Sequence, residues 1–214
     1  MAGTTVSDDG AVLAAFDAAL DAAAVDAGEW RRAADLEVRS TMGRSKIDVF
    51  RSVLGDDAQA LSANAAFEAA YQAQVDTGRV RPLPGAEETV AALRRAGMKV
   101  VLLTGFSAGT RDLLVERLGW EHLADAVLCP ADAGRGRPAP DLVLSALLRT
   151  ATSAVSAVAA AGDTANDMRS ALAAGAPLRV GVLTGTHDAA TLWAAGATHV
   201  LADVTAIGDV LGLS

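Results

Sequence analysis

Short apolar runs alternate with helical patterns along the second half of the chain, and this alternation restricts the fold more than any other feature. The clearest run, at residues 99–104, is rich in β-branched and aliphatic side chains, as strands are. Further strand candidates are residues 126–129, 157–161, 179–183 and 199–201. The helical patterns before and between them cover residues 86–96, 110–118, 140–149, 168–174 and 189–195. This order predicts an α/β fold whose parallel sheet is covered by helices on both faces.

The part of the chain before residue 81 has helical patterns only. They cover residues 11–26, 28–42, 45–54 and 58–74, with breaks at Gly43 and Gly55. Pro82 and Pro84 then mark a hinge, because proline restricts the backbone and interrupts regular structure. The sequence therefore predicts an all-helical block joined to the α/β part.

Composition limits the size and the partners of the molecule. A chain of 214 residues that is 51% hydrophobic and 21% charged can bury one sizeable core with a small insertion. Its formal charge of -8 argues against nucleic acid or an anionic membrane as the main partner, since phosphate groups are held chiefly by Lys and Arg. We therefore expect a small diffusible substrate.

Cysteine usage and hydropathy indicate the compartment. Cys129 is the only cysteine, so an intrachain disulfide is excluded and a reducing cytoplasm is the default. No apolar stretch approaches the roughly 20 residues that cross a bilayer, and no signal-peptide pattern opens the chain. We therefore expect a cytoplasmic protein.

An acidic pair follows the apolar run at residues 157–161, which stops on Gly-Asp-Thr-Ala-Asn-Asp at residues 162–167. A buried strand there delivers Asp163 and Asp167 to the carboxyl edge of the sheet, where open α/β sheets bind ligands. Paired carboxylates are what a hard divalent cation such as Mg2+ requires. The alternative is structural: Asp163 caps the next helix and Asp167 is a solvated surface charge.

The chain opens with Met-Ala-Gly-Thr-Thr-Val, a turn-like run with no strand in front of it. Together with the Gly-Asp-x-x-x-Asp segment, this run resembles the haloacid dehalogenase superfamily of phosphotransfer hydrolases. The first motif of that superfamily is a strand ending in a nucleophilic aspartate, one spacer residue, an acidic residue or its replacement, and then Gly-Thr. The alternative is an ordinary N-terminus that matches by chance.

Met1 matches the spacer, so the resemblance implies that the nucleophile and its strand, which belongs at the sheet centre, lie ahead of Met1. We therefore expect a start codon assigned at an internal methionine, and negligible turnover by a polypeptide that starts there.

The resemblance also implies an architecture and a magnesium site. It implies a Rossmann-like core of residues 1–10 and 81–214 and an inserted helical cap of residues 11–80, with motion at residues 81–85. Mg2+ would be held by the missing aspartate, the backbone carbonyl of Ala2, and Asp163, with Asp167 as a direct or water-bridged ligand.

Other motif residues would face the substrate. Thr104 and Gly105 match the second motif, whose hydroxyl and backbone N–H hold a phosphoryl oxygen; packing in a strand is the alternative explanation for Thr104. The resemblance likewise implies substrate contacts for Gly3, Thr4 and Phe106.

Two arginines lie in Gly-Arg-Gly-Arg-Pro at residues 134–138. The superfamily normally has lysine here, and its phosphonoacetaldehyde hydrolase branch has arginine within Gly-Arg-Pro, which Arg137 matches. A guanidinium fork can bind two phosphoryl oxygens at once. We expect Arg135 to be solvated.

Ala2 stands where phosphomonoester hydrolases of the superfamily carry an aspartate that acts as general acid. Alanine cannot protonate a departing alkoxide, and losing such an acid typically costs about 10²- to 10⁴-fold in rate. The resemblance therefore favours a reaction whose leaving group is not an alkoxide.

The segment Met-Gly-Arg-Ser-Lys-Ile-Asp at residues 42–48 resembles the Met-Gly-x-x-Lys-Ile-Asp motif of the phosphonoacetaldehyde hydrolase branch. There the lysine condenses with the substrate aldehyde, so Lys46 is the candidate, with Met42 and Gly43 beside the substrate. The alternative is a solvated lysine at a helix start. Val49 and Phe106 replace a histidine and a tyrosine of that branch, so the substrate can differ from phosphonoacetaldehyde.

The combined prediction is a Mg2+-dependent hydrolase that cleaves the C–P bond of a small carbonyl phosphonate. The alternatives are a phosphomonoesterase of the phosphoglycolate phosphatase kind and a non-catalytic phosphate-binding protein. Relatives often dimerise through their caps, so a homodimer through the cap is a further expectation by analogy. His122, His187 and His199 lack metal-ligand spacing and are interpreted as structural.

Overall fold

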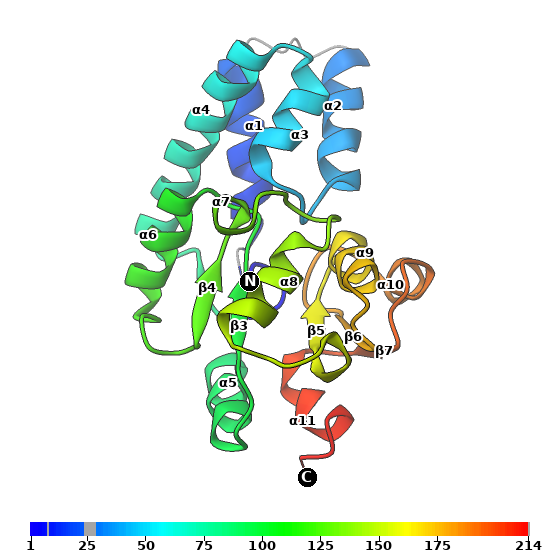
Figure 1. The fold of residues 1–214 in the computed structure, drawn as a ribbon. Coiled ribbons are helices and arrows are strands. Elements are labelled where there is room, and N and C mark those ends of the chain that lie inside the picture. The colour runs from blue at the N-terminus through cyan, green and yellow to red at the C-terminus, as the bar shows by residue number, and fades with distance from the viewer. Residues whose placement is uncertain (8, 24–28, 214) are drawn as a thin grey trace.

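The computed structural model describes residues 1–7, 9–23 and 29–213. In these residues a bundle of long helices stands on one end of an α/β core, and the N-terminus lies near the centre of the core (Figure 1). The bundle consists of α1 (Ala11–Ala22), α2 (Glu29–Ser40), α3 (Lys46–Leu54) and α4 (Asp57–Asp76). The predicted helical cap is confirmed, although residues 24–26 of the first predicted helix lie outside the described residues.

Local signals in the sequence fix the ends of the cap helices. Gly55 ends α3 with φ 71°, a left-handed conformation that glycine adopts at no steric cost. Asp56 then caps α4, because its carboxylate accepts a hydrogen bond from the backbone N–H of Gln59 at 2.8 Å. Inside the bundle the rings of Phe16 and Phe67 lie 4.8 Å apart between centroids and join α1 to α4.

The core strands form parallel ladders, as predicted. Strand β3 (Val101–Leu103) pairs with β4 (Ala126–Leu128). In the second ladder β6 (Leu178–Val182) lies between β5 (Ala159–Gly162) and β7 (His199–Leu201). The strand predicted at residues 157–161 is shifted, because its ladder with β6 begins at Ala159 and a short 3-10 turn, Val155–Ala157, precedes it.

Two further strands were not predicted from the sequence. Strand β1 (Val6–Ser7) pairs antiparallel with β2 (Arg81–Pro82), where only a hinge was expected. The pairing joins the segments that enter and leave the cap, so no local pattern could reveal it. The cap is therefore connected to the core through a two-stranded ribbon.

A cavity of about 450 Å³ separates the two parallel ladders. Strands β3 and β5 both line it and are not hydrogen-bonded to each other. Apolar side chains dominate the lining, including Val90, Leu103 and Val143. The inner edges of β3 and β5 therefore face an apolar space rather than another strand.

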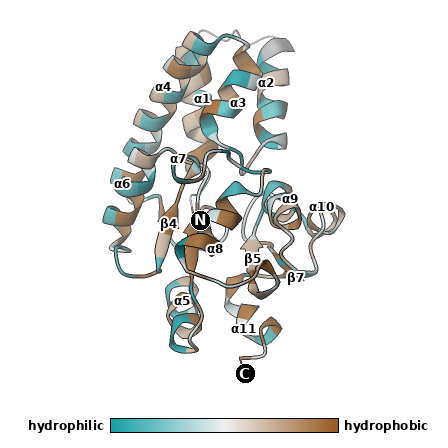
Figure 2. Ribbon diagram, in the orientation of Figure 1, coloured by the Kyte–Doolittle hydropathy of each residue, from teal (hydrophilic) through white to brown (hydrophobic). Residues whose placement is uncertain are grey.

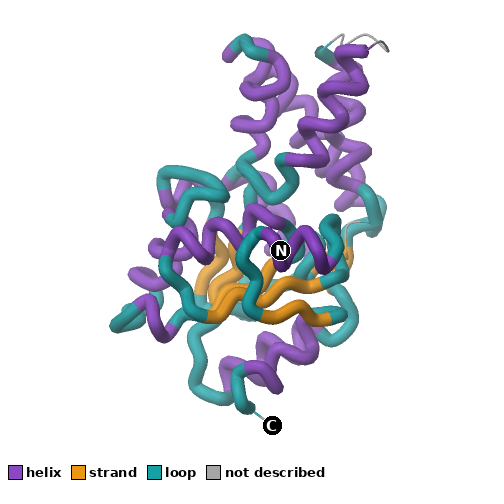
Figure 3. Tube along the Cα trace, turned by 90° about the vertical axis from the view of Figure 1, so that its right-hand side faces the viewer, coloured by secondary structure: helices purple, strands orange, loops and turns teal. Residues whose placement is uncertain are grey.

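Helices cover both faces of the sheet (Figure 3). The remaining helices are α5 (Ala86–Arg95), α6 (Ala108–Leu118), α7 (Pro130–Ala133), α8 (Asp141–Arg149), α9 (Ala165–Ala174), α10 (Ala189–Ala194) and α11 (Ile207–Val210). One buried cluster joins α5 and α11 to β6, and another joins α9 to α10. Figure 2 shows hydrophobic residues along β4 and alternating hydrophilic and hydrophobic residues along the helices. The short helices α7 and α11 were not predicted.

Within the described part of the chain, no helix combines the length and the apolar character needed to cross a bilayer.

Candidate active site

The carboxyl ends of β3 and β5 meet the first turn of the chain. The Met1 amine donates to the carbonyl oxygen of Leu103, the last residue of β3, at 3.0 Å. The Met1 carbonyl accepts from the backbone N–H groups of Thr4, Thr5 and Val6 at 2.9–3.0 Å, which folds residues 1–6 into a tight turn. This turn brings Ala2, Gly3 and Thr4, all predicted site residues, to the edge where β5 ends.

Asp163 lies at the centre of this edge and is only 5% exposed. Its Oδ1 accepts from the Thr4 hydroxyl at 3.1 Å, and its Oδ2 accepts from the Thr186 N–H at 3.1 Å. A Cβ added at Gly3 or Gly185 would overlap this carboxylate, so both glycines leave room for it. Burial, followed by the charge of Asp167, raises the pKa of Asp163.

Asp167 lies in the first turn of α9 and is also buried, with 10% of its side chain exposed. Its Oδ2 accepts from the Thr164 N–H at 3.0 Å and from the Thr164 hydroxyl at 2.6 Å. Burial opposes ionisation, but the charge of Arg137 and the Thr164 hydrogen bonds outweigh it and hold the pKa of Asp167 below its usual range. The alternative placed Asp163 as the helix cap and Asp167 as a solvated charge; both placements are wrong, because Thr164 is the cap and Asp167 is about nine-tenths buried in the capping box.

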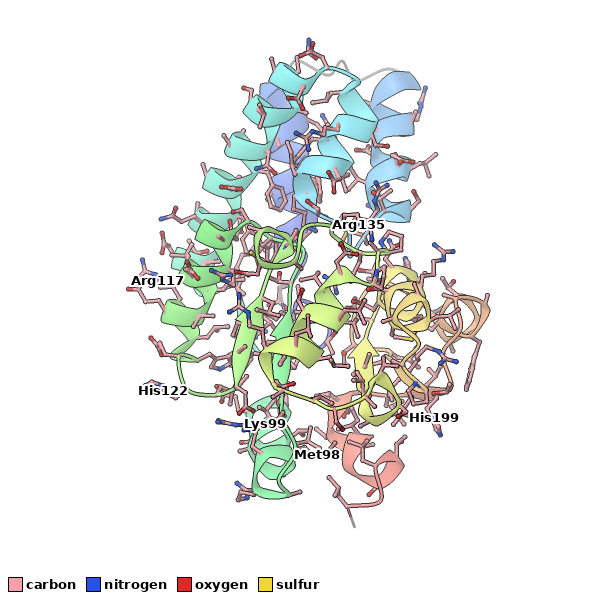
Figure 4. All side chains as sticks on the ribbon, in the orientation of Figure 1. Met98, Lys99, Arg117, His122, Arg135 and His199 are labelled. Atoms are coloured by element: carbon pink, nitrogen blue, oxygen red, sulfur yellow. The ribbon has the colours of Figure 1, made fainter. Side chains whose placement is uncertain are left out.

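Arg137 forms an ion pair with Asp167 from the Gly-Arg-Pro loop. Its side chain is 9% exposed, and its Nε is buried without a hydrogen-bond partner among the described residues. A buried donor of this kind is costly unless a ligand or a bound water satisfies it. Arg135, by contrast, is exposed and pairs with Asp141 at 2.8 Å, so its expected solvated position is confirmed (Figure 4).

The charges at this edge suit a bound cation. Burial and then the charge of Asp167 raise the pKa of Asp163, so its ionised form lacks stabilisation at this edge. A cation beside Asp163 would stabilise the ionised carboxylate that burial disfavours. The described residues contain no group of three or more His, Cys, Asp or Glu side chains placed to hold a metal. Further ligands would have to be backbone oxygens, such as the predicted Ala2 carbonyl, or water, which are ordinary ligands of hard divalent cations.

Thr104 follows β3 and is buried at the same edge. Its backbone N–H donates to the carbonyl of Leu128 at 2.9 Å, and its hydroxyl accepts from the Phe106 N–H at 3.3 Å. The hydroxyl therefore belongs to a fixed turn at the strand end, as the second motif requires. Phe106 is buried and points toward the cap, where its ring centroid lies 4.7 Å from that of Tyr71.

Lys46 is the first residue of α3 and is only 8% exposed, so the alternative of a solvated lysine is wrong. Its Nζ lies 5.4, 6.0 and 5.3 Å from the ring centroids of Phe16, Phe67 and Phe106. Two of these rings belong to the cap and one to the core. The amine therefore occupies an aromatic pocket at the boundary between them.

The loop before Lys46 lies directly on the core. Gly43 contacts Thr164, and the Lys46 backbone N–H donates to the Gly105 carbonyl at 3.3 Å. The Met42 carbonyl accepts from the Asn166 side chain at 2.8 Å. The predicted residues Met42, Gly43 and Gly105 thus meet at one cap–core contact.

Sequence reasoning missed three side chains near this site. Asn166 holds Met42, and the Thr184 hydroxyl donates to the Gly3 carbonyl at 2.6 Å. The Nδ1 of His187 accepts from the Ala165 N–H at 2.8 Å and so supports the start of α9. No spacing could identify Asn166 or His187, whereas Thr184 follows a strand directly. His122 and His199 lie on the outside of the core (Figure 4).

Comparison with known protein families and sequences identifies the family of this chain. A family model described as haloacid dehalogenase-like hydrolase matches residues 1–175. The phosphonoacetaldehyde hydrolase of Parabacteroides distasonis is 32% identical over 110 residues, which are 50% of this chain and 40% of that protein. The phosphonoacetaldehyde hydrolase of Hahella chejuensis is 30% identical over 168 residues, 71% of this chain and 57% of that protein. The matched segments thus span about half the length of these curated relatives.

Solved structures share the fold. A hydrolase from Pseudomonas syringae has a TM-score of 0.84 at 25% identity and covers 99% of this chain and 94% of its own. A phosphonoacetaldehyde hydrolase-like protein from Oleispira antarctica has a TM-score of 0.84 at 21% identity, and the match covers 99% of this chain and 88% of that protein. A predicted phosphoglycolate phosphatase from Haemophilus somnus has a TM-score of 0.79 at 17% identity, and the match covers 99% of this chain and 95% of that protein. With its Rossmann-like core and helical cap, the chain belongs to the haloacid dehalogenase-like hydrolases.

Proposed function

We propose that this hydrolase cleaves the C–P bond of a small phosphonate that carries an aldehyde or ketone. The observation that carries the proposal is the position of Lys46. Its amine lies in a buried aromatic pocket of the cap, and its backbone contacts Gly105, which follows the strand end at Thr104. The names of the curated relatives, phosphonoacetaldehyde hydrolases, support the same substrate class.

The phosphoryl group would bind at the carboxyl edge of the core. The buried Nε of Arg137 supplies a donor with no partner in the described residues, and the Thr104 hydroxyl and the Gly105 N–H supply further polar groups. Asp163, Asp167 and the Ala2 carbonyl would hold Mg2+, which supplies positive charge for the phosphoryl oxygens when bound. Arg137 and Thr104 would hold the phosphoryl group in one orientation.

The carbonyl carbon would face Lys46. The neutral Lys46 amine adds to the carbonyl and releases water, which leaves a protonated imine on the substrate. When a nucleophile attacks phosphorus, the electrons of the C–P bond flow into this imine and the organic part leaves as an enamine. Protonation of the enamine carbon gives an imine again, and water hydrolyses this imine to release the aldehyde or ketone from Lys46. A second water releases phosphate from the nucleophile. The three phenyl rings favour a cation at this nitrogen and exclude bulk water.

The nucleophile is assigned to a carboxylate on a strand directly ahead of Met1. One observation supports this assignment: an apolar cavity lies between β3 and β5, and Met1 lines it. A strand in that cavity would pair with both neighbours and end beside Asp163. Since Ala2 cannot act as general acid, the assignment also favours C–P cleavage over ester hydrolysis.

Borohydride trapping tests the proposal. Lysine occurs only at positions 46 and 99, so two matched variants cover both side-chain amines. Phosphonoacetaldehyde with borohydride should add one reduced adduct to Lys46, and Lys46→Arg should abolish it while Lys99→Arg leaves it unchanged. In parallel, phosphate release is measured on protein that carries the in-frame upstream residues. Fast turnover of phosphate esters with Lys46 unmodified would instead identify a phosphomonoesterase.

A further inference from the structure

Asn166 connects the cap to the turn that carries the acidic pair. Asn166 is 3% exposed, and its Nδ2 donates to the Met42 carbonyl at 2.8 Å. The two residues are 124 positions apart in the sequence. Asn166 lies between Asp163 and Asp167 at the start of α9. The proposed chemistry gives this residue no role, although it contacts the loop that leads to Lys46.

That loop, residues 41–46, fits the core without spare room. A Cβ added at Gly105 would lie 2.5 Å from the Arg44 carbonyl oxygen, and one at Gly136 would lie 2.9 Å from the Ser45 Cβ. Gly43 approaches Thr164 so closely that a Cβ there would overlap the threonine hydroxyl. The loop therefore rests on the core through glycine backbone. The Lys46 N–H bond to Gly105 and the Asn166 amide bond to Met42 both help to hold it there.

We propose that Asn166 is a positioning residue that fixes Lys46 relative to the carboxylates. The first turn of α9 holds Asp167 through its capping box and holds the cap loop through Asn166. The first turn of α9 would thus position both the phosphoryl group and the carbonyl group of the substrate. This matters because small displacements of reacting groups lower the reaction rate. This role rests on the proposed function of Lys46, whereas the contact between Asn166 and Met42 does not.

The test measures how accessible Lys46 is in the unliganded protein. Asn166→Ala removes the donor, so the loop should separate from the core more often and expose the Lys46 amine. Trinitrobenzenesulfonate should modify Lys46 about fivefold faster, the factor that corresponds to losing one ordinary hydrogen bond. Lys99 is exposed and serves as an internal reference, so the result is a ratio of two lysine rates within one protein.

Matched variants separate positioning from general stability. Ser170→Ala removes another buried side-chain hydrogen bond from α9, to the Ala139 carbonyl at 2.7 Å, within the core alone. Arg117→Ala removes a different cap–core contact, the exposed ion pair with Asp76 at 2.9 Å (Figure 4). Both should leave the Lys46 to Lys99 ratio unchanged. Asn166→Gln keeps an amide donor and should restore part of the protection.

An unchanged ratio in Asn166→Ala, or an equal rise in Ser170→Ala or Arg117→Ala, would overturn the positioning role. If the alanine variant does not fold, Asn166→Leu decides, because it keeps a side chain of similar size and cannot donate a hydrogen bond. A raised ratio together with failed borohydride trapping would keep the contact and reject the imine chemistry. The two proposals can therefore fail separately.

Discussion

Arg137 and Asp167 form an ion pair in which each side chain is about nine-tenths buried. The pair joins the Gly-Arg-Pro loop to the first turn of α9, two segments that each resemble a motif of the family. Asp167 also closes the capping box with Thr164, so one carboxylate stabilises both the helix start and the arginine. The site therefore owes part of its shape to a charge contact between distant motifs.

Removing Arg137 should destabilise the fold strongly. In protein without metal, Arg137→Ala leaves the buried Asp167 carboxylate without its guanidinium partner, and breaking a buried pair in this way costs about 3 kcal/mol or more. Arg135→Ala is the matched control in the same loop, because Arg135 is exposed and exposed ion pairs contribute little to stability. Urea unfolding of the two variants at pH 7 measures the difference. Equal losses would show that burial of the Arg137 pair has no such effect.

The sequence predicts the position of Asp163 because a local pattern, an apolar run followed by glycine and aspartate, signals a strand end. It likewise predicts the cap helices, whose apolar spacing and flanking glycines are local. It could not predict that Asn166 contacts Met42, because their meeting depends on how the cap lies on the core. The sequence also could not predict that β1 pairs with β2 or that β3 and β5 lie apart, because both features depend on segments distant in sequence.

Asp163→Asn should separate folding from metal binding. Burial raises the pKa of Asp163, so the neutral isostere avoids a desolvation cost. Without metal, the free energy of unfolding of the variant should lie within about 1 kcal/mol of that of the parent. Mg2+ at about 100 times its dissociation constant should stabilise the parent by about 2.7 kcal/mol and leave the variant unchanged. Thermal melts with Mg2+ or with EDTA measure both effects. The exposed control Asp112→Asn should keep the Mg2+ response, and an equal response in Asp163→Asn would exclude this carboxylate as a ligand.

Asp125 should make the core sensitive to acid. The Val100 N–H donates to it at 3.0 Å and Lys99 at 3.2 Å, and these bonds lower the pKa of Asp125. A lowered pKa in the folded state adds stability above the unfolded pKa of about 3.9, and this stability is lost as pH falls through the folded value. Asp125→Asn should therefore cost about 1 kcal/mol at pH 7 and lose less stability than the parent between pH 5 and pH 3. Parallel pH profiles in urea unfolding would contradict this assignment.

Gly105→Ala should lift the cap loop from the core. The added Cβ would lie 2.5 Å from the Arg44 carbonyl oxygen, which is backbone and cannot rotate away as a flexible side chain can. We expect faster amide hydrogen exchange at residues 43–46 and a more reactive Lys46, with the core strands unaffected. Gly109→Ala is the control, because its Cβ meets nothing within 4 Å and alanine suits a helix better than glycine by about 0.5–1 kcal/mol. If exchange in the loop is as slow in Gly105→Ala as in Gly109→Ala, the loop tolerates the methyl group and the close fit does not hold Lys46 in place.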